Sequence, residues 1–107
     1  MARAKARRKL GIPLRAVAYQ HGEWWIAHCL ELDLVAEGRD PIHALQDLMD
    51  LSASQIESAI QRGDLESVFR PAPPAIWATF SRTQDTTIKR KPPRPVERFE
   101  AREAVPM

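Results

Sequence analysis

Residues 40–63, DPIHALQDLMDLSASQIESAIQRG, constrain the fold of this 107-residue chain more than any other stretch. Apolar residues recur here three and four positions apart, which places them on one face of an α-helix. Asp40 suits the capping position before the helix, Pro41 suits the first turn, and Gly63 suits the position after the end. We therefore predict a helix over residues 41–62, about 33 Å long at ~1.5 Å per residue. Its apolar stripe consists of Ile42, Leu45, Leu48, Met49, Ser52, Ile56, Ala59 and Ile60.

The sequence before the helix predicts three short strands. Residues 14–19 (LRAVAY) alternate in size and polarity, and residues 23–29 (EWWIAHC) are rich in aromatic and β-branched side chains. His21-Gly22 suits the two-residue loop of a β-hairpin between them, with both residues able to adopt a positive φ. Residues 30–33 (LELD) interrupt the pattern as a connection or a bulge, and residues 34–38 (LVAEG) predict a third strand.

The sequence after the helix is less regular. Residues 76–82 (IWATFSR) suit either a short helix or a strand, and the preceding Pro73-Pro74 favours the helix. Residues 89–95 (KRKPPRP) predict a stiff, polyproline-like linker. Residues 96–105 (VERFEAREAV) alternate again and predict a last strand. Because acids share the face that carries Phe99, we expect this strand at an edge of the sheet, partly open to water.

These elements predict an α+β fold in the order β-β-β-α-β. We expect a mainly antiparallel sheet of three to four strands with the long helix packed on one face. The length allows a single domain, which we place at residues 13–107, after a flexible basic arm at residues 1–12.

The charge distribution leaves two interpretations open. The formal net charge is only +2, but both ends of the chain are basic and the middle is acidic. Such ends are either solvating tails or contacts for nucleic acid. The residues that would contact nucleic acid are Arg3, Lys5, Arg7, Arg8, Lys9, Lys89, Arg90 and Lys91. No apolar run approaches the ~20 residues that span a bilayer, and a single cysteine suits a reducing compartment, so we expect a cytoplasmic protein.

Residues 28–45, HCLELDLVAEGRDPIHAL, hold the side chains from which a reaction centre could be built. His28 and Cys29 are neighbours on a predicted strand and therefore point to opposite faces, which disfavours a shared metal or a catalytic pair. Glu31 and Asp33 would share a face in an extended segment and could hold a divalent ion, but a solvated turn explains them as well. We expect no catalytic, cofactor-binding or metal-binding residue and no enzymatic activity.

A protein-binding surface is the remaining prospect. A single sheet with a helix on one face leaves its second face uncovered, and Trp24 and Ile26, with Val17 or Leu14, could form an apolar patch there. The alternative is that Ile76, Trp77, Phe80 and the last strand cover that face themselves.

Residues 25–45, WIAHCLELDLVAEGRDPIHAL, resemble the HicB-like antitoxin family. Glu31-Leu32-Asp33-Leu34 stands where the family has a Pro-Asp-Leu turn, Gly38 matches a family glycine, and Ala44-Leu45 match its Ala-Leu pair. The resemblance implies a partial ribonuclease-H-like domain, self-association, and direct binding of a small, basic, RNA-cleaving toxin, without a membrane or a cofactor. The family's turn proline and the Glu-Glu before Ala-Leu are missing, and we expect a member without the family's DNA-binding domain. The residues that we expect to contact the partner are Trp24, Ile26, Glu31 and Asp33.

Overall fold

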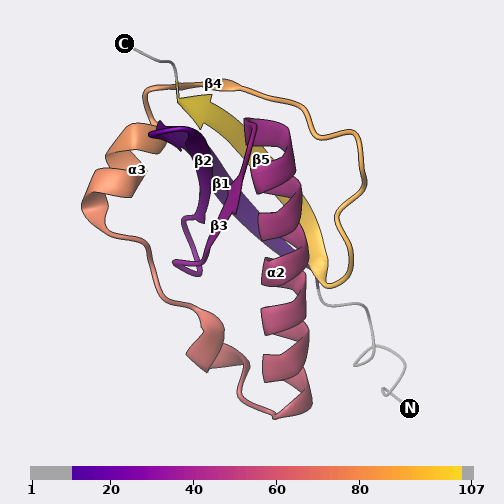
Figure 1. Cartoon of the computed structure of the whole chain (residues 1–107). Coiled ribbons are helices and arrows are strands. Elements are labelled where there is room, and N and C mark those ends of the chain that lie inside the picture. The colour runs from indigo at the N-terminus through magenta and orange to yellow at the C-terminus, as the bar shows by residue number, and fades with distance from the viewer. Residues whose placement is uncertain (1–10, 105–107) are drawn as a thin grey trace.

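The computed structural model describes residues 11–104 and has an α+β fold, with one long helix packed on a mixed sheet (Figure 1). Its elements are β1 (Ile12–His21), β2 (Trp24–Cys29), β3 (Val35–Gly38), α2 (Pro41–Gln61), η1 (Leu65–Val68), α3 (Pro74–Phe80), β4 (Thr83–Asp85) and β5 (Val96–Ala104).

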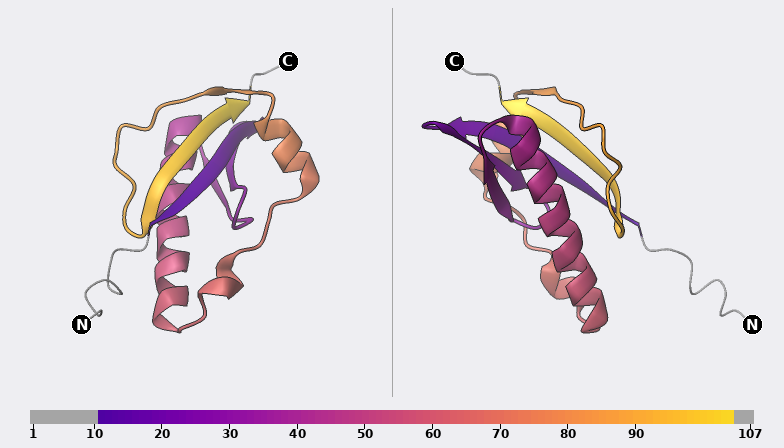
Figure 2. Two further views of the ribbon diagram at one scale, coloured as in Figure 1. Left: turned by 180° about the vertical axis from the view of Figure 1, so that it is seen from behind. Right: turned by 45° about the vertical axis from the view of Figure 1, so that its right-hand side comes forward.

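The sheet has five strands in the order β3-β2-β1-β5-β4. Neighbouring strands are antiparallel except for the central pair, β1 and β5, which run parallel. Figure 2 shows these two strands side by side, with α2 behind them in the left-hand view. A parallel pair needs a long crossover, and here α2 and the segments after it supply that crossover.

The main core lies between α2 and one face of the sheet. Leu14 and Ala16 of β1, Ala27 of β2 and Ala101 of β5 are buried and belong to one apolar cluster with Leu48 and its neighbours on α2. The predicted stripe on the helix is largely confirmed, because Leu45, Leu48, Met49, Ser52, Ile56 and Ala59 are buried.

The start of α2 is fixed as the sequence predicts. The side chain of Asp40 accepts a hydrogen bond from the backbone N–H of His43 at 2.8 Å, and Pro41 occupies the first turn. Gly38 lies so close to the helix that an added Cβ would stand 2.7 Å from the backbone nitrogen of Ala44. The glycine at the end of β3 therefore sets how closely the helix approaches the sheet.

Several predicted boundaries shift in the structure. β1 begins at Ile12, inside the predicted arm, because the N–H of Ile12 donates to the carbonyl of Pro95 at 3.0 Å. The hairpin loop is Gly22-Glu23 instead of His21-Gly22, since His21 pairs with Trp24, and only Gly22 of the predicted pair has a positive φ. Residues 1–10 of the predicted arm and Val105 of the predicted last strand lie outside the described residues.

Two predictions about strands are wrong. The last strand, β5, lies inside the sheet between β1 and β4 and not at its edge. Its acids are tolerated because Phe99 and Ala101, in the middle of the strand, contact the core, while Glu97 is exposed near one end. The sheet also has a fifth strand, β4, whose sequence TQD carries no apolar alternation and becomes a strand by pairing with β5.

The segment between β4 and β5 passes along the α2 side of the sheet. Ile88 packs on the edge of the core, and Arg90 forms an ion pair with Asp50 on the outer side of α2. The predicted linker, residues 89–95, has no regular helix or strand, and this ion pair ties it to the helix.

Candidate functional site on the second face of the sheet

The short helix α3, which the sequence favours over a strand, covers part of the face opposite α2. Arg15 of β1 stacks over the ring of Trp77 at 4.7 Å, and Arg102 of β5 stacks over Phe80 at 4.9 Å. Val17, which lies on this face between them, is fully buried. α3 therefore covers the second face around Val17 and Arg102, which is part of what one of the two alternatives predicted, whereas Arg98 and Glu100 of β5 remain exposed on that face. Leu14 does not belong to this face, because its side chain is part of the core beneath α2.

Over β2 and β3 the same face remains open. Trp24 is 44% exposed, Val35 is 51% exposed and Ile26 is half-buried. The strand register pairs Ile26 with Glu37 and His28 with Val35, so Ile26 is a diagonal neighbour of Val35, and Trp24 lies two residues from Ile26 toward the other end of the strand pair. We call Trp24, Ile26 and Val35 the β2–β3 patch. Arg39 stacks over the ring of Trp24 at 5.6 Å and shields part of it.

A chain of hydrogen bonds borders the β2–β3 patch. Nε2 of His28 lies 2.7 Å from Oδ1 of Asp33, and Nδ1 lies 3.4 Å from the hydroxyl of Tyr19. An ionised carboxylate only accepts hydrogen bonds, so Nε2 of the ring donates to Asp33. Burial, followed by the charge of Asp33, raises the pKa of Tyr19 and keeps its hydroxyl protonated.

Asp33 is held in place by its backbone as well as by its side chain. Its φ of 54° is the positive value that Asp and Asn adopt more readily than most residues, and its N–H donates to the carbonyl of Cys29 at 3.0 Å. The carboxylate is thus turned back onto His28, although 32% of the side chain is exposed. Asp33, one of the residues that we expected to contact a partner, therefore stabilises the turn through its hydrogen bonds to His28 and Cys29.

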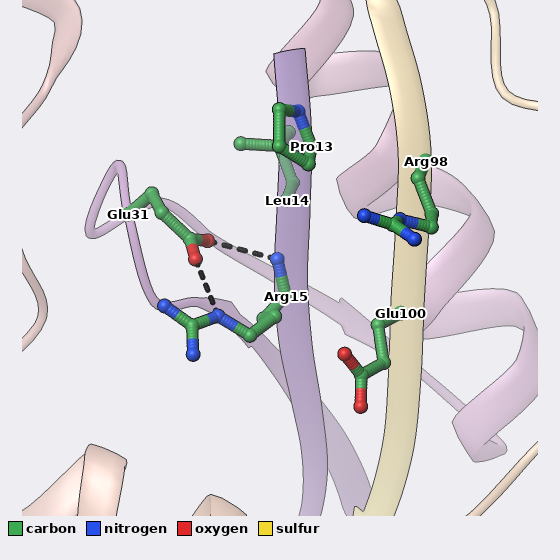
Figure 3. Close-up of a pocket in the computed structure, with 6 residues that line it drawn as sticks. All are labelled: Pro13, Leu14, Arg15, Glu31, Arg98 and Glu100. Atoms are coloured by element: carbon green, nitrogen blue, oxygen red, sulfur yellow. Dashed lines mark hydrogen bonds and ion pairs between the residues drawn. The ribbon is translucent and has the colours of Figure 1, made fainter.

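Glu31, in the same turn, has a similar task, because it binds Arg15 of β1. Its carboxylate accepts from the backbone N–H of Arg15 at 2.8 Å and from the Nε of Arg15 at 2.7 Å (Figure 3). It thereby satisfies a main-chain donor of β1 that would otherwise lack a partner. Beside this clamp lies a shallow hollow of about 240 Å³, lined by Pro13, Leu14, Arg15, Glu31, Arg98 and Glu100.

The acids lie in a turn and not in an extended segment, and each faces a different basic side chain. Glu31 is bound by Arg15 and Asp33 by His28. Among residues 11–104, no group of three or more His, Cys, Asp or Glu side chains is arranged to hold a metal ion.

Cys29 lies on the α2 side of β2, on the opposite face from His28, as predicted. Burial raises the pKa of its thiol to about 11, so the nucleophilic thiolate is scarce at neutral pH. His43, near the start of α2, is exposed, and its ring contacts Asp40 at 2.7 Å.

Of the alternative nucleic-acid contacts, Lys89, Arg90 and Lys91 lie within the described residues. Arg3, Lys5, Arg7, Arg8 and Lys9 lie outside the described residues. Arg90 is engaged with Asp50, whose hydrogen bond raises the pKa of the guanidinium, and Lys89 and Lys91 on either side are exposed.

Sequence reasoning missed Tyr19 and Arg39 as members of this region. The signal for Tyr19 was present, because a hairpin closed at His21 and Trp24 pairs Tyr19 with Ile26 and brings it next to His28. The position of Arg39 over Trp24 had no such local signal.

No protein-family model, curated protein or solved structure matches this chain. In the part of the chain that the structure covers, no helix has both the length and the apolar character needed to cross a membrane.

Proposed function

We propose that this chain is a non-enzymatic protein-interaction module, similar to the HicB-like antitoxins, that neutralises a small, basic, RNA-cleaving toxin by direct binding. The observation that carries the proposal is the β2–β3 patch. A Trp 44% exposed and a Val 51% exposed lie at the two ends of the β2–β3 part of the face, with Ile26 between them, and α3 covers only another part of that face. Exposed apolar side chains grouped in this way are typical of protein interfaces, where Trp is enriched among the residues that dominate binding.

The charges around the patch fit a basic partner. Glu23 at the hairpin turn and Glu37 on β3 are both exposed beside it. Complementary charge speeds association and selects among partners more than it strengthens the final complex.

The roles of the two turn acids refine the expected interface. Glu31 and Asp33 are bound to Arg15 and His28, so they support the proposal by shaping the surface instead of meeting the toxin. The element order and the acidic turn at residues 31–34 support the family resemblance.

The test is binding of the purified chain to the HicA-type toxins encoded in its own cell, measured by calorimetry and by relief of RNA cleavage. We expect Trp24→Ala to weaken binding about thirtyfold, the effect of losing ~2 kcal/mol at a binding hot spot. Phe69→Ala is the matched control, because Phe69 is an equally exposed aromatic, 44%, outside the patch. Binding to none of these toxins would refute the proposal, and equal losses in both variants would place the interface elsewhere.

A further inference from the structure

The shallow hollow beside Glu31 lies outside the β2–β3 patch, because none of its lining residues belongs to the patch. It has a volume of about 240 Å³ and spans β1, with Glu31 on one side and Arg98 and Glu100 of β5 on the other (Figure 3). Pro13 of β1 lies between them and offers exposed apolar surface. Liquid water occupies ~30 Å³ per molecule, so the hollow has room for a ligand the size of a single amino acid.

The charged side chains that line the hollow are balanced. They are Arg15, Arg98, Glu31 and Glu100, two of each sign, so their formal charges cancel. A ligand with a single charge of either sign would lie near two side chains of like charge, and salt screens such repulsion less in a partly enclosed site than on an open surface. A ligand that carries one positive and one negative group avoids this repulsion when each group faces a side chain of opposite charge.

One pair of opposite charges is already formed within the chain. The carboxylate of Glu31 accepts two hydrogen bonds from Arg15, at 2.8 and 2.7 Å, and the guanidinium of Arg15 stacks over the ring of Trp77. The carbonyl of Glu31 also accepts from the N–H of Arg70 at 3.0 Å. This side of the hollow is therefore fixed before a ligand arrives, which lowers the entropic cost of binding.

The second pair is open to a ligand. Among the described residues the side chain of Arg98 forms no ion pair, and Figure 3 shows its guanidinium directed from β5 toward β1. Glu100 accepts from Nε of Arg102 through Oε2 at 3.2 Å, and within residues 11–104 its Oε1 has no partner. Arg98 and Glu100 are two residues apart on one strand, so their side chains share a face and start about 7 Å apart. A cationic donor and an anionic acceptor thus lie side by side over the hollow.

We propose that the hollow binds a free α-amino acid, with the carboxylate of the ligand on Arg98 and its ammonium group on Glu100. A guanidinium offers parallel N–H groups to a carboxylate, and an ammonium group donates to the carboxylate of a glutamate. The side chain of the ligand then lies over the ring of Pro13, which favours a small aliphatic side chain. This binding site goes beyond the proposed neutralisation of a toxin and does not depend on it.

The first test uses the unmodified chain and three matched compounds in NMR titrations at neutral pH and low salt. L-valine carries both charged groups, isovalerate lacks the amino group, and isobutylamine lacks the carboxylate. We expect L-valine to bind saturably and to shift the amide signals of Arg15, Arg98 and Glu100. Isovalerate and isobutylamine should each bind about fivefold more weakly, because each loses one partly exposed ion pair.

The second test assigns the two contacts by substitution. Arg98→Gln and Glu100→Gln should each weaken the binding of L-valine about fivefold. Arg82→Gln and Glu97→Gln are the matched controls and should leave it unchanged, because both residues are exposed and neither lines the hollow. Circular dichroism checks that the variants fold.

Three results would overturn the proposal. The first is that L-valine produces no saturable shift of these amide signals. The second is that isovalerate or isobutylamine binds as tightly as L-valine, which would make the hollow a site for a single charge. The third is that the control variants lose as much affinity as Arg98→Gln and Glu100→Gln. If a variant does not fold, the three compounds and the unmodified chain decide the question by themselves.

Discussion

Substitution of Asp33 tests directly whether its hydrogen bond to His28 and its positive φ stabilise the turn between β2 and β3. Replacing Asp33 with Ala removes two separate contributions. The hydrogen bond to His28 is charge-assisted, which is worth ~1.5–3 kcal/mol when fully formed. With 32% of the Asp33 side chain exposed, we discount it to about 1 kcal/mol. The φ of 54° adds about 1–2 kcal/mol for an alanine, which lacks the short polar side chain that eases this conformation.

The sum predicts that Asp33→Ala lowers the free energy of unfolding by about 2–3 kcal/mol. Asp33→Asn keeps the favoured backbone and a weaker hydrogen bond, so its loss should be about 1 kcal/mol or less. Urea denaturation of the three proteins, followed by circular dichroism with a shared m-value, measures both differences.

Two results would refute this reasoning. If Asp33→Ala were within 0.5 kcal/mol of the unmodified chain (about the spread of ordinary surface substitutions), neither contribution would exist. If Asp33→Asn lost as much as Asp33→Ala, the positive φ would contribute nothing and the carboxylate charge would carry the whole effect.

Two further predictions concern the core beneath α2. The buried Ser52 hydroxyl has no nitrogen or oxygen hydrogen-bond partner among the described residues and meets the thiol of Cys29, a weak partner, so Ser52→Ala should stabilise the chain by about 1 kcal/mol more than Ser54→Ala. Ser54 is exposed on the same helix and controls for helix propensity; equal effects in urea denaturation would mean that Ser52 has a partner after all. Burial raises the pKa of the Cys29 thiol from 9.0 to about 11, so stability should fall as the pH rises from about 9 to about 11. Cys29→Ala should flatten that part of the stability profile, measured by thermal unfolding, and an unchanged slope would contradict the assignment.

The candidate site was only partly visible in the sequence. Trp24 and Ile26 were expected on one face of a strand, and they are there, because alternation along a strand is a local property. The sequence also singled out Glu31 and Asp33, but it did not show that they bind Arg15 and His28. The partner of Glu31, Arg15, is sixteen residues away on β1. No local sequence pattern shows which of several basic residues will contact the turn.

The sequence by itself determined the elements whose signals are local. Asp40, Pro41 and the apolar spacing after them are sufficient for α2, since capping and one-sided burial act within a few turns. Gly22 likewise marked the hairpin, although the loop is displaced by one residue.

Only the tertiary structure decided how these elements meet. β5 inserts beside β1 instead of lying at the edge, because the crossover through α2 and α3 returns the chain to the middle of the sheet. β4 forms because its backbone pairs with β5, and α3 covers part of β1 and β5 but leaves Trp24 of β2 and Val35 of β3 exposed. These outcomes depend on contacts between residues far apart in the chain, whose free energies appear only when the whole sheet is assembled.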